Sequence, residues 1–198
     1  MKERPILFSA PMVRAILNGT KTQTRRAVKD RHIDSAPPAC IFQWLRERCT
    51  YGQPGDRLWV REAFMHEPAD YCWEASVSIP CRPAETVYRA DHDGDTRGAG
   101  WKPSIHMPRA LSRILLEITS VRVEPLQDIS EADAVAEGIA RDGDGYERFH
   151  VDPDAPVGQS FTRNPVLAYR GLWDYINGGG AWDKNPLVWV IEFRRVAQ

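Results

Sequence analysis

The apolar residues of this chain fall into short segments whose period changes between two and about 3.6 along the sequence. Strand-like patterns cover four segments, at 6–8, 57–64, 112–123 and 187–193. Helical spacing marks three others, at 12–17, 131–137 and 166–176. Short strands separated by single helices, without regular βαβ alternation, favour a mixed α/β (α+β) fold in which a small β-barrel carries helices on its outside.

Capping residues indicate where two of the helices begin or end, and the alternation of apolar residues in one strand requires a bulge. Ser9 and Ser130 are N-cap candidates for the first two helices, and Gly138 follows the second helix as a stop signal. The strand at 112–123 keeps its apolar residues mostly buried only if a bulge near 119–120 shifts its phase.

The length of 198 residues suits one domain, and the hydrophobic fraction of 42% favours a packed core over disorder. Three stretches, at 30–50, 65–100 and 140–162, are predicted as loop insertions into a single domain that spans 1–198. No apolar run reaches the roughly 20 residues that span a bilayer, and no signal-type segment opens the chain. We therefore expect a cytoplasmic protein with no membrane contact.

Cysteine usage points to a reducing compartment. The four cysteines, at positions 40, 49, 72 and 81, are too few and too dispersed for a disulfide-dense secreted scaffold. A four-thiolate zinc site is the alternative, but structural zinc ligands usually come in closely spaced pairs, and the sequence contains none. We therefore predict no metal and no cofactor.

Charge is unevenly distributed along the chain. The net charge is only −1, but residues 1–61 hold 12 Lys and Arg against 5 Asp and Glu. This asymmetry permits a basic face on a nearly neutral molecule. Charges interleaved over a solvated surface are the alternative.

The densest group of cations and hydroxyls follows the first helix, in the sequence NGTKTQTRR at 18–26. Arginine grips an oxyanion through two parallel hydrogen bonds, lysine adds a point charge, and threonine adds directed donors. We expect these residues to bind an anion such as a phosphate: Lys21, Thr22, Thr24, Arg25 and Arg26. A solvated strand edge protected by charge is the alternative.

Two further groups are candidates for a binding cleft. Glu62 shares a strand face with Leu58 and Val60, so it must pair with a cation, for which Arg25 is a candidate, or lie at a cleft edge. A second group combines an aromatic residue with basic and hydrogen-bonding ones, as sites that stack an unpaired base do: Trp101, Lys102, His106 and Arg109. A packing role for Trp101 is the alternative.

Three stretches resemble, in order and spacing, the ASCH domain of the PUA-like superfamily: ILNGTKTQTRR (16–26), PGDRLWVRE (54–62) and ISEADAVAEG (129–138). The stretches at 101–109 and 172–193 resemble ASCH proteins encoded in phages and prophages. The resemblance implies a PUA-like β-barrel of about six strands with flanking helices. It also implies a cleft beside the first helix that binds RNA or a modified nucleoside.

The resemblance to an ASCH-type N4-acetylcytidine amidohydrolase implies three catalytic positions, which fall on Lys21, Thr24 and Glu137 when matched motif to motif. Amide hydrolysis needs a nucleophile, a base and an acid. Thr24 can attack, Lys21 can take its proton if burial and nearby cations lower the lysine's pKa, and Glu137 can shuttle the proton. Lys21 and Thr24 converge only if the turn after Gly19 extends through Lys21 or a bulge intervenes.

Glu137 falls in the last turn of its helix, where a carboxylate meets the negative end of the helix dipole. Lys21 is the expected compensating cation. Two other functions stay open: a non-catalytic RNA-binding module and a metal-dependent ribonuclease, because another ASCH protein is described as a ribonuclease. The insertions could cover the cleft or recruit a protein partner.

Overall fold

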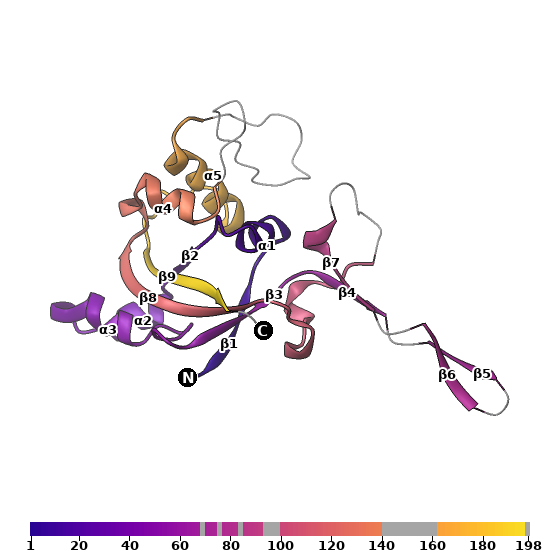
Figure 1. Cartoon of the computed structure of the whole chain (residues 1–198). Coiled ribbons are helices and arrows are strands. Elements are labelled where there is room, and N and C mark those ends of the chain that lie inside the picture. Colours follow the sequence, from indigo (N-terminus) through magenta and orange to yellow (C-terminus); the bar gives the residue numbers. More distant parts are fainter. Residues whose placement is uncertain (68–69, 75–76, 83–84, 93–99, 140–161, 197–198) are drawn as a thin grey trace.

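Figure 1 shows the computed structural model of the chain. It describes the backbone of residues 1–67, 70–74, 77–82, 85–92, 100–139 and 162–196. Side chains are described for the same residues except those at 67–82.

A five-stranded sheet lies at the centre of the molecule. Its strands, in spatial order, are β1 (Glu3–Leu7), β3 (Arg57–Arg61), β8 (Leu115–Pro125), β9 (Leu187–Val196) and β2 (Gln23–Ala27). β1 pairs with β3 in parallel, and the other neighbours are antiparallel. Two smaller sheets each contain two strands, β4 (Phe64–Glu67) with β7 (Glu85–Tyr88), and β5 (Asp70–Glu74) with β6 (Val77–Arg82).

Five α-helices are present in the described residues: α1 (Ala10–Leu17), α2 (Asp30–Asp34), α3 (Ile41–Glu47), α4 (Glu131–Ala136) and α5 (Pro165–Asn177). Short 3-10 turns are η1 (Pro38–Cys40), η2 (Arg89–Asp91), η3 (Ser104–His106), η4 (Arg109–Leu111) and η5 (Leu126–Asp128). The mixed α/β class predicted from the sequence is confirmed. Within the described ranges, no helix has the length and apolar character needed to cross a membrane.

The long strands β8 and β9 curve around one side of the molecule (Figure 1). Their register shifts between Ile118 and Ser120, which confirms the bulge predicted near 119–120. The ladder begins at β1 and ends at β2, and in the described part of the chain no backbone pairing joins these two edge strands. A side chain does connect them, because Arg26 Nη2 donates to the carbonyl oxygen of Leu7 at 2.7 Å.

β9 is buried on both faces, and its alternation sorts the core into two clusters. Trp189, Ile191 and Phe193 pack into the cluster that contains α1 and β3 residues. Val188 and Val190 point the other way, into a cluster with residues of α4 and α5. The sheet thus carries a packed layer on each side of β9. Helices α4 and α5 contact each other and cover the layer that contains Val188 and Val190 (Figure 1).

The segments predicted as insertions differ in what they contribute. The stretch at 30–50 forms α2 and α3 and supplies fully buried Leu45, whose carbonyl oxygen accepts a hydrogen bond of 2.9 Å from the indole of Trp189. The stretch at 65–100 includes β7, which pairs with β4. The stretch predicted at 140–162 lies outside the described residues, except for its last residue.

Gly138 ends α4 in a conformation that favours glycine. Its φ is +94°, and a Cβ added there would lie 3.1 Å from Ala15 Cβ and 3.2 Å from Lys21 Cβ. At Gly55, φ is +89° but an added Cβ meets nothing within 4 Å. The two glycines therefore share backbone strain and differ in crowding.

We predict that Gly138→Ala lowers the free energy of unfolding by about 2–4 kcal/mol, because backbone strain of about 1–2 kcal/mol is joined by a steric contact. Gly55→Ala should show the backbone cost alone. Urea denaturation of both variants measures the difference. Equal losses would show that α1 and Lys21 give way to the added methyl group without cost.

Candidate functional site

The turn after α1 extends through Lys21 before β2 begins. The backbone N–H groups of Thr20 and Lys21 both donate to the carbonyl oxygen of Ala15, at 2.9 and 3.1 Å. Lys21 is therefore not part of the regular strand, and its side chain does not follow the alternation that begins at Gln23. This is one of the two conditions that the sequence set for Lys21 and Thr24 to converge.

Lys21 closes the C-terminal end of α4. Its Nζ donates to the carbonyl oxygen of Glu137 at 2.7 Å and to the carboxylate Oε2 of the same residue at 2.9 Å. Both side chains are buried, with exposed fractions of 0% and 3%. The ammonium thus compensates both the carboxylate and the negative end of the helix, as the sequence predicted.

Glu137 also pairs with Arg25, the second buried cation of the site. Arg25 Nη1 donates to Glu137 Oε1 at 3.2 Å, so each carboxylate oxygen of Glu137 faces a different cation. Arg25 Nη2 reaches two more carboxylates, Glu124 at 2.6 Å and Asp133 at 3.0 Å. Arg122 continues the network to the same two acids, at 3.0 and 2.9 Å.

The network shifts the proton affinity of its members. Burial lowers the pKa of Lys21, and the attraction of Glu137 offsets only part of that effect. Burial acts to raise the pKa of Asp133, but the positive charges of Arg25 and Arg122 outweigh it, so the pKa of this carboxyl lies below its ordinary value. Lys21 therefore gives up its proton more readily than an exposed lysine.

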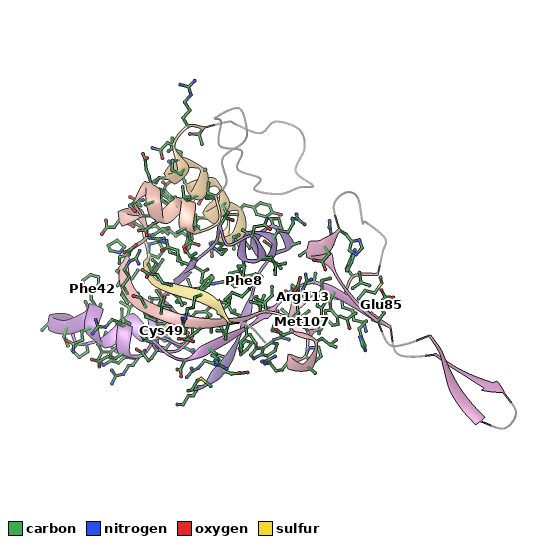
Figure 2. All side chains as sticks on the ribbon, in the orientation of Figure 1. Phe8, Phe42, Cys49, Glu85, Met107 and Arg113 are labelled. Carbon is green, nitrogen blue, oxygen red and sulfur yellow. The ribbon has the colours of Figure 1, made fainter. Side chains whose placement is uncertain are left out.

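A cavity of about 380 Å³ opens beside these charges, between α1, β2 and α5. Its polar lining includes Thr24, Arg25, Arg26 and Glu137. Its apolar and aromatic lining includes Phe8, Met12, Tyr169, Leu172, Trp173 and Ile176. Figure 2 shows Phe8 near the middle of the molecule, next to α1. The volume and the mixture of surfaces are those of a site for a small molecule.

Two buried hydroxyl groups in the cavity wall have no hydrogen-bond partner among the described residues. Thr24 and Tyr169 are each 4% exposed, and both line the cavity. Neither hydroxyl is among the buried polar atoms that are sealed from solvent without a partner. The two groups therefore face the cavity and are available to a ligand.

The sequence missed the aromatic wall of this cavity. Tyr169, Leu172, Trp173 and Ile176 form the apolar stripe of α5, which predicted core packing. Part of that stripe is buried core, and the same side chains line the cavity. The hydroxyl group of Tyr169, within an otherwise apolar stripe, was the feature of the sequence that could have indicated a cavity wall.

The expected pair between Glu62 and Arg25 is wrong. Glu62 is 1% exposed, and Arg113 binds it through Nε at 2.9 Å and Nη2 at 3.1 Å. Arg113 also contacts Asp91 at 2.6 Å. This cluster lies toward β4 and β7, where Figure 2 labels Arg113, and Glu62 does not line the cavity of Thr24 and Glu137.

The remaining members of the NGTKTQTRR group differ in position. The side chain of Thr22 is exposed, and its backbone joins α4 to β9 by accepting from Phe193 N–H and donating to the Ala136 carbonyl oxygen. Arg26 lines the cavity, with its guanidinium 5.4 Å from the centre of the Phe8 ring. Arg26 forms no ion pair with a carboxylate of the described residues.

The candidate group at 101–109 does not gather in the cavity. Trp101 is half-buried beside His92, with ring centroids 5.5 Å apart, and Arg109 pairs with Glu3 at 3.0 Å. Lys102 and His106 are exposed. From this stretch only Ser104 is part of the cavity lining.

Metal ligands do not cluster in the described residues, where no group of three or more His, Cys, Asp or Glu side chains could hold an ion. Cys40 is exposed and Cys49 is buried, and both are free thiols. The side chains of the other two cysteines lie outside the described set. Comparisons with family models, with curated proteins and with solved structures find no match to this chain.

We predict that Glu137→Gln lowers the free energy of unfolding by about 3–5 kcal/mol, because two buried cations lose a charged partner. Lys21→Met should cost less in the Glu137→Gln background than in the wild type, with a coupling energy of about 1–3 kcal/mol. Urea denaturation of the four proteins of the cycle measures this coupling.

The matched control is Glu117→Gln, which removes an ion pair with Arg194 whose side chain is 68% exposed. Solvent screening limits that loss to about 0–1 kcal/mol. If the two glutamate variants lose the same amount, the buried pairs do not determine the stability of the site.

The lowered pKa of Asp133 predicts a pH-dependent stability. In the folded protein the Asp133 carboxyl stays ionised at a pH where the same carboxyl in the unfolded chain takes up a proton. Its contribution to stability is therefore complete above the pKa of the unfolded chain. That contribution is lost as the pH falls through the pKa of the folded protein. The stability difference between wild type and Asp133→Asn should therefore shrink as pH falls from about 6 to about 3. Urea denaturation across this range checks it, and a constant difference would contradict an electrostatic role.

Proposed function

We propose that this chain binds a modified nucleoside in the cavity between α1, β2 and α5, and that it hydrolyses the amide of an N4-acylated cytidine there. One observation carries the proposal. The Thr24 hydroxyl and the Glu137 carboxylate line the same cavity, and the buried amine of Lys21 contacts that carboxylate at 2.9 Å. A nucleophile and a carboxylate thus line one hollow, and a lysine of lowered pKa lies behind the carboxylate, outside the cavity lining.

The proposal extends to the fold and family. The curved β8 and β9, and the Arg26 side chain that connects β2 to β1, support a PUA-like barrel of the ASCH type (Figure 1). In such a fold the cleft beside the first helix holds the ligand. The cavity has this position, because Pro11 and Met12 of α1 form part of its wall.

The first chemical step joins Thr24 to the acyl group. Thr24 Oγ1 attacks the amide carbonyl carbon, and its proton passes to the pair formed by Glu137 and Lys21. In this pair the carboxylate Oε2 of Glu137 takes the proton, and the lowered pKa of Lys21 eases the later loss of a proton from its ammonium, which lies 2.9 Å away. Collapse of the tetrahedral intermediate breaks the C–N bond, and the same pair returns a proton to the leaving N4 amine of cytidine.

A second step regenerates the hydroxyl. Water attacks the acyl ester on Thr24, releases the carboxylic acid and restores Oγ1–H. Glu137 lies in the cavity wall next to this position and can take the proton of the attacking water. The net reaction consumes one water and yields cytidine and the free acid.

The rest of the cavity suits a nucleoside. Aromatic faces from Phe8, Tyr169 and Trp173 provide stacking surfaces for a planar base. Arg26 brings a positive charge to the lining without a carboxylate partner in the described residues, which suits the phosphate of a nucleotide. An N4-acylated cytidine within RNA is therefore a second form of the same substrate.

We predict that the purified protein releases cytidine from N4-acetylcytidine. Thr24→Val keeps the shape of the side chain and removes the nucleophile, so kcat should fall by about 10³-fold or more. The kcat of Lys21→Ala should fall by a similar factor. Chromatography of the nucleosides measures both rates.

The matched control is Thr119→Val, which makes the same change at an exposed position on β8. It should retain wild-type turnover. No cytidine release by the wild type would reject the hydrolase. Retained affinity for cytidine in equilibrium dialysis would then point to a binding module without catalysis.

A further inference from the structure

The proposed reaction does not yet use the buried hydroxyl group of Tyr169. It lies in the middle of α5, its side chain is 4% exposed, and it lines the cavity. A buried phenol usually donates to a partner, and among the described residues this one has none. Its hydrogen bond is therefore available to a molecule that occupies the cavity.

The ring of Tyr169 is held in place by its neighbours. Its centroid lies 6.2 Å from Trp173 and 6.4 Å from Trp182. α5 itself begins at a firm cap, because Asn164 Oδ1 accepts hydrogen bonds from the N–H groups of Val166 and Leu167. A donor on a rigid helix with a fixed ring needs little reorganisation when charge develops near it.

The electrostatic surroundings keep this phenol protonated. Burial raises the pKa of Tyr169 well above its ordinary value, and the negative charge of Glu137 raises it further. Tyr169 lines the same cavity as Thr24 and Glu137. Tyr169 is thus a hydrogen-bond donor at neutral pH, in the same cavity as the proposed nucleophile.

We propose that the Tyr169 hydroxyl donates a hydrogen bond to the carbonyl oxygen of the acyl group and stabilises the negative charge that develops there when Thr24 attacks. This inference rests on the proposed hydrolase function. In the step, the C–O bond to Thr24 forms, and the carbonyl π pair moves onto the oxygen that Tyr169 contacts. Tyr169 keeps its proton, and collapse of the intermediate returns the pair as the C–N bond breaks.

A donor of this kind distinguishes Tyr169 from a residue that only packs. Donors that meet a developing oxyanion act on the chemical step, whereas a wall residue acts on ligand binding. Tyr169→Phe removes the hydroxyl and keeps the ring between Trp173 and Trp182. We expect kcat to fall by about 10²–10³-fold while KM changes by less than about threefold.

The control is Tyr88→Phe, which also removes a phenolic hydroxyl, here one that donates to the carbonyl oxygen of Leu111 at 2.9 Å outside the cavity. It should keep the wild-type kcat. Circular dichroism and urea denaturation of both variants confirm that each is folded before its rate is measured.

A second measurement uses a phosphonamidate analogue of N4-acetylcytidine, in which tetrahedral phosphorus replaces the acyl carbon. Its dissociation constant should rise for Tyr169→Phe by a factor similar to the fall in kcat, while that of cytidine stays within about threefold. An active wild type with unchanged kcat in Tyr169→Phe, or with only KM changed, would overturn the role of Tyr169 and leave the hydrolase standing. An inactive wild type would overturn both.

Discussion

The site depends on the burial of two cations against one carboxylate. Lys21, Arg25 and Glu137 have side chains that are 0–3% exposed, and each carboxylate oxygen of Glu137 meets a different cation. An isolated charge at this depth would cost several kcal/mol, and Glu137 is the carboxylate that cannot be removed without leaving the buried ammonium of Lys21 unpaired. The arrangement fixes the C-terminal end of α4 against the turn that precedes β2. It thereby sets the position of Glu137 relative to Thr24.

A buried ion-pair network of this size is weak evidence for stability by itself. Apolar residues of similar volume often do as well or better, because the charges must be taken out of water. The network does hold the carboxylate of Glu137 in one orientation at the cavity wall, with Lys21 behind it and Arg25 beside it. Orientation of reacting groups is what an active site requires and what an apolar core cannot provide. The cost of burying these charges is therefore consistent with a catalytic site.

The sequence predicted those features that depend on local physics. The helix ending near Glu137 required a compensating cation. Lys21 and Thr24 could converge only if the turn after Gly19 extended through Lys21 or a bulge intervened. The structure meets both. Lys21 and Glu137 nevertheless lie 116 residues apart, and it was the resemblance of their motifs, not local physics, that predicted their pairing. The class of the fold and the bulge in β8 were also predictable, because they follow from periodicity. The partner of Glu62 was not, since Arg113 lies 51 residues further along the chain and pairing at that distance depends on how the strands assemble.

The cavity wall shows why the rest of the site was hidden in the sequence. Core and cavity are lined by the same apolar stripe of α5, and the periodicity that identifies a buried face does not say whether another protein side chain or a ligand covers it. The polar groups within the stripe are what separate the two. In a close-packed core the Tyr169 hydroxyl would need a partner from the protein, yet among the described residues it has none. An apolar stripe with an unsatisfied hydroxyl is therefore better explained as the wall of a cavity than as close-packed core.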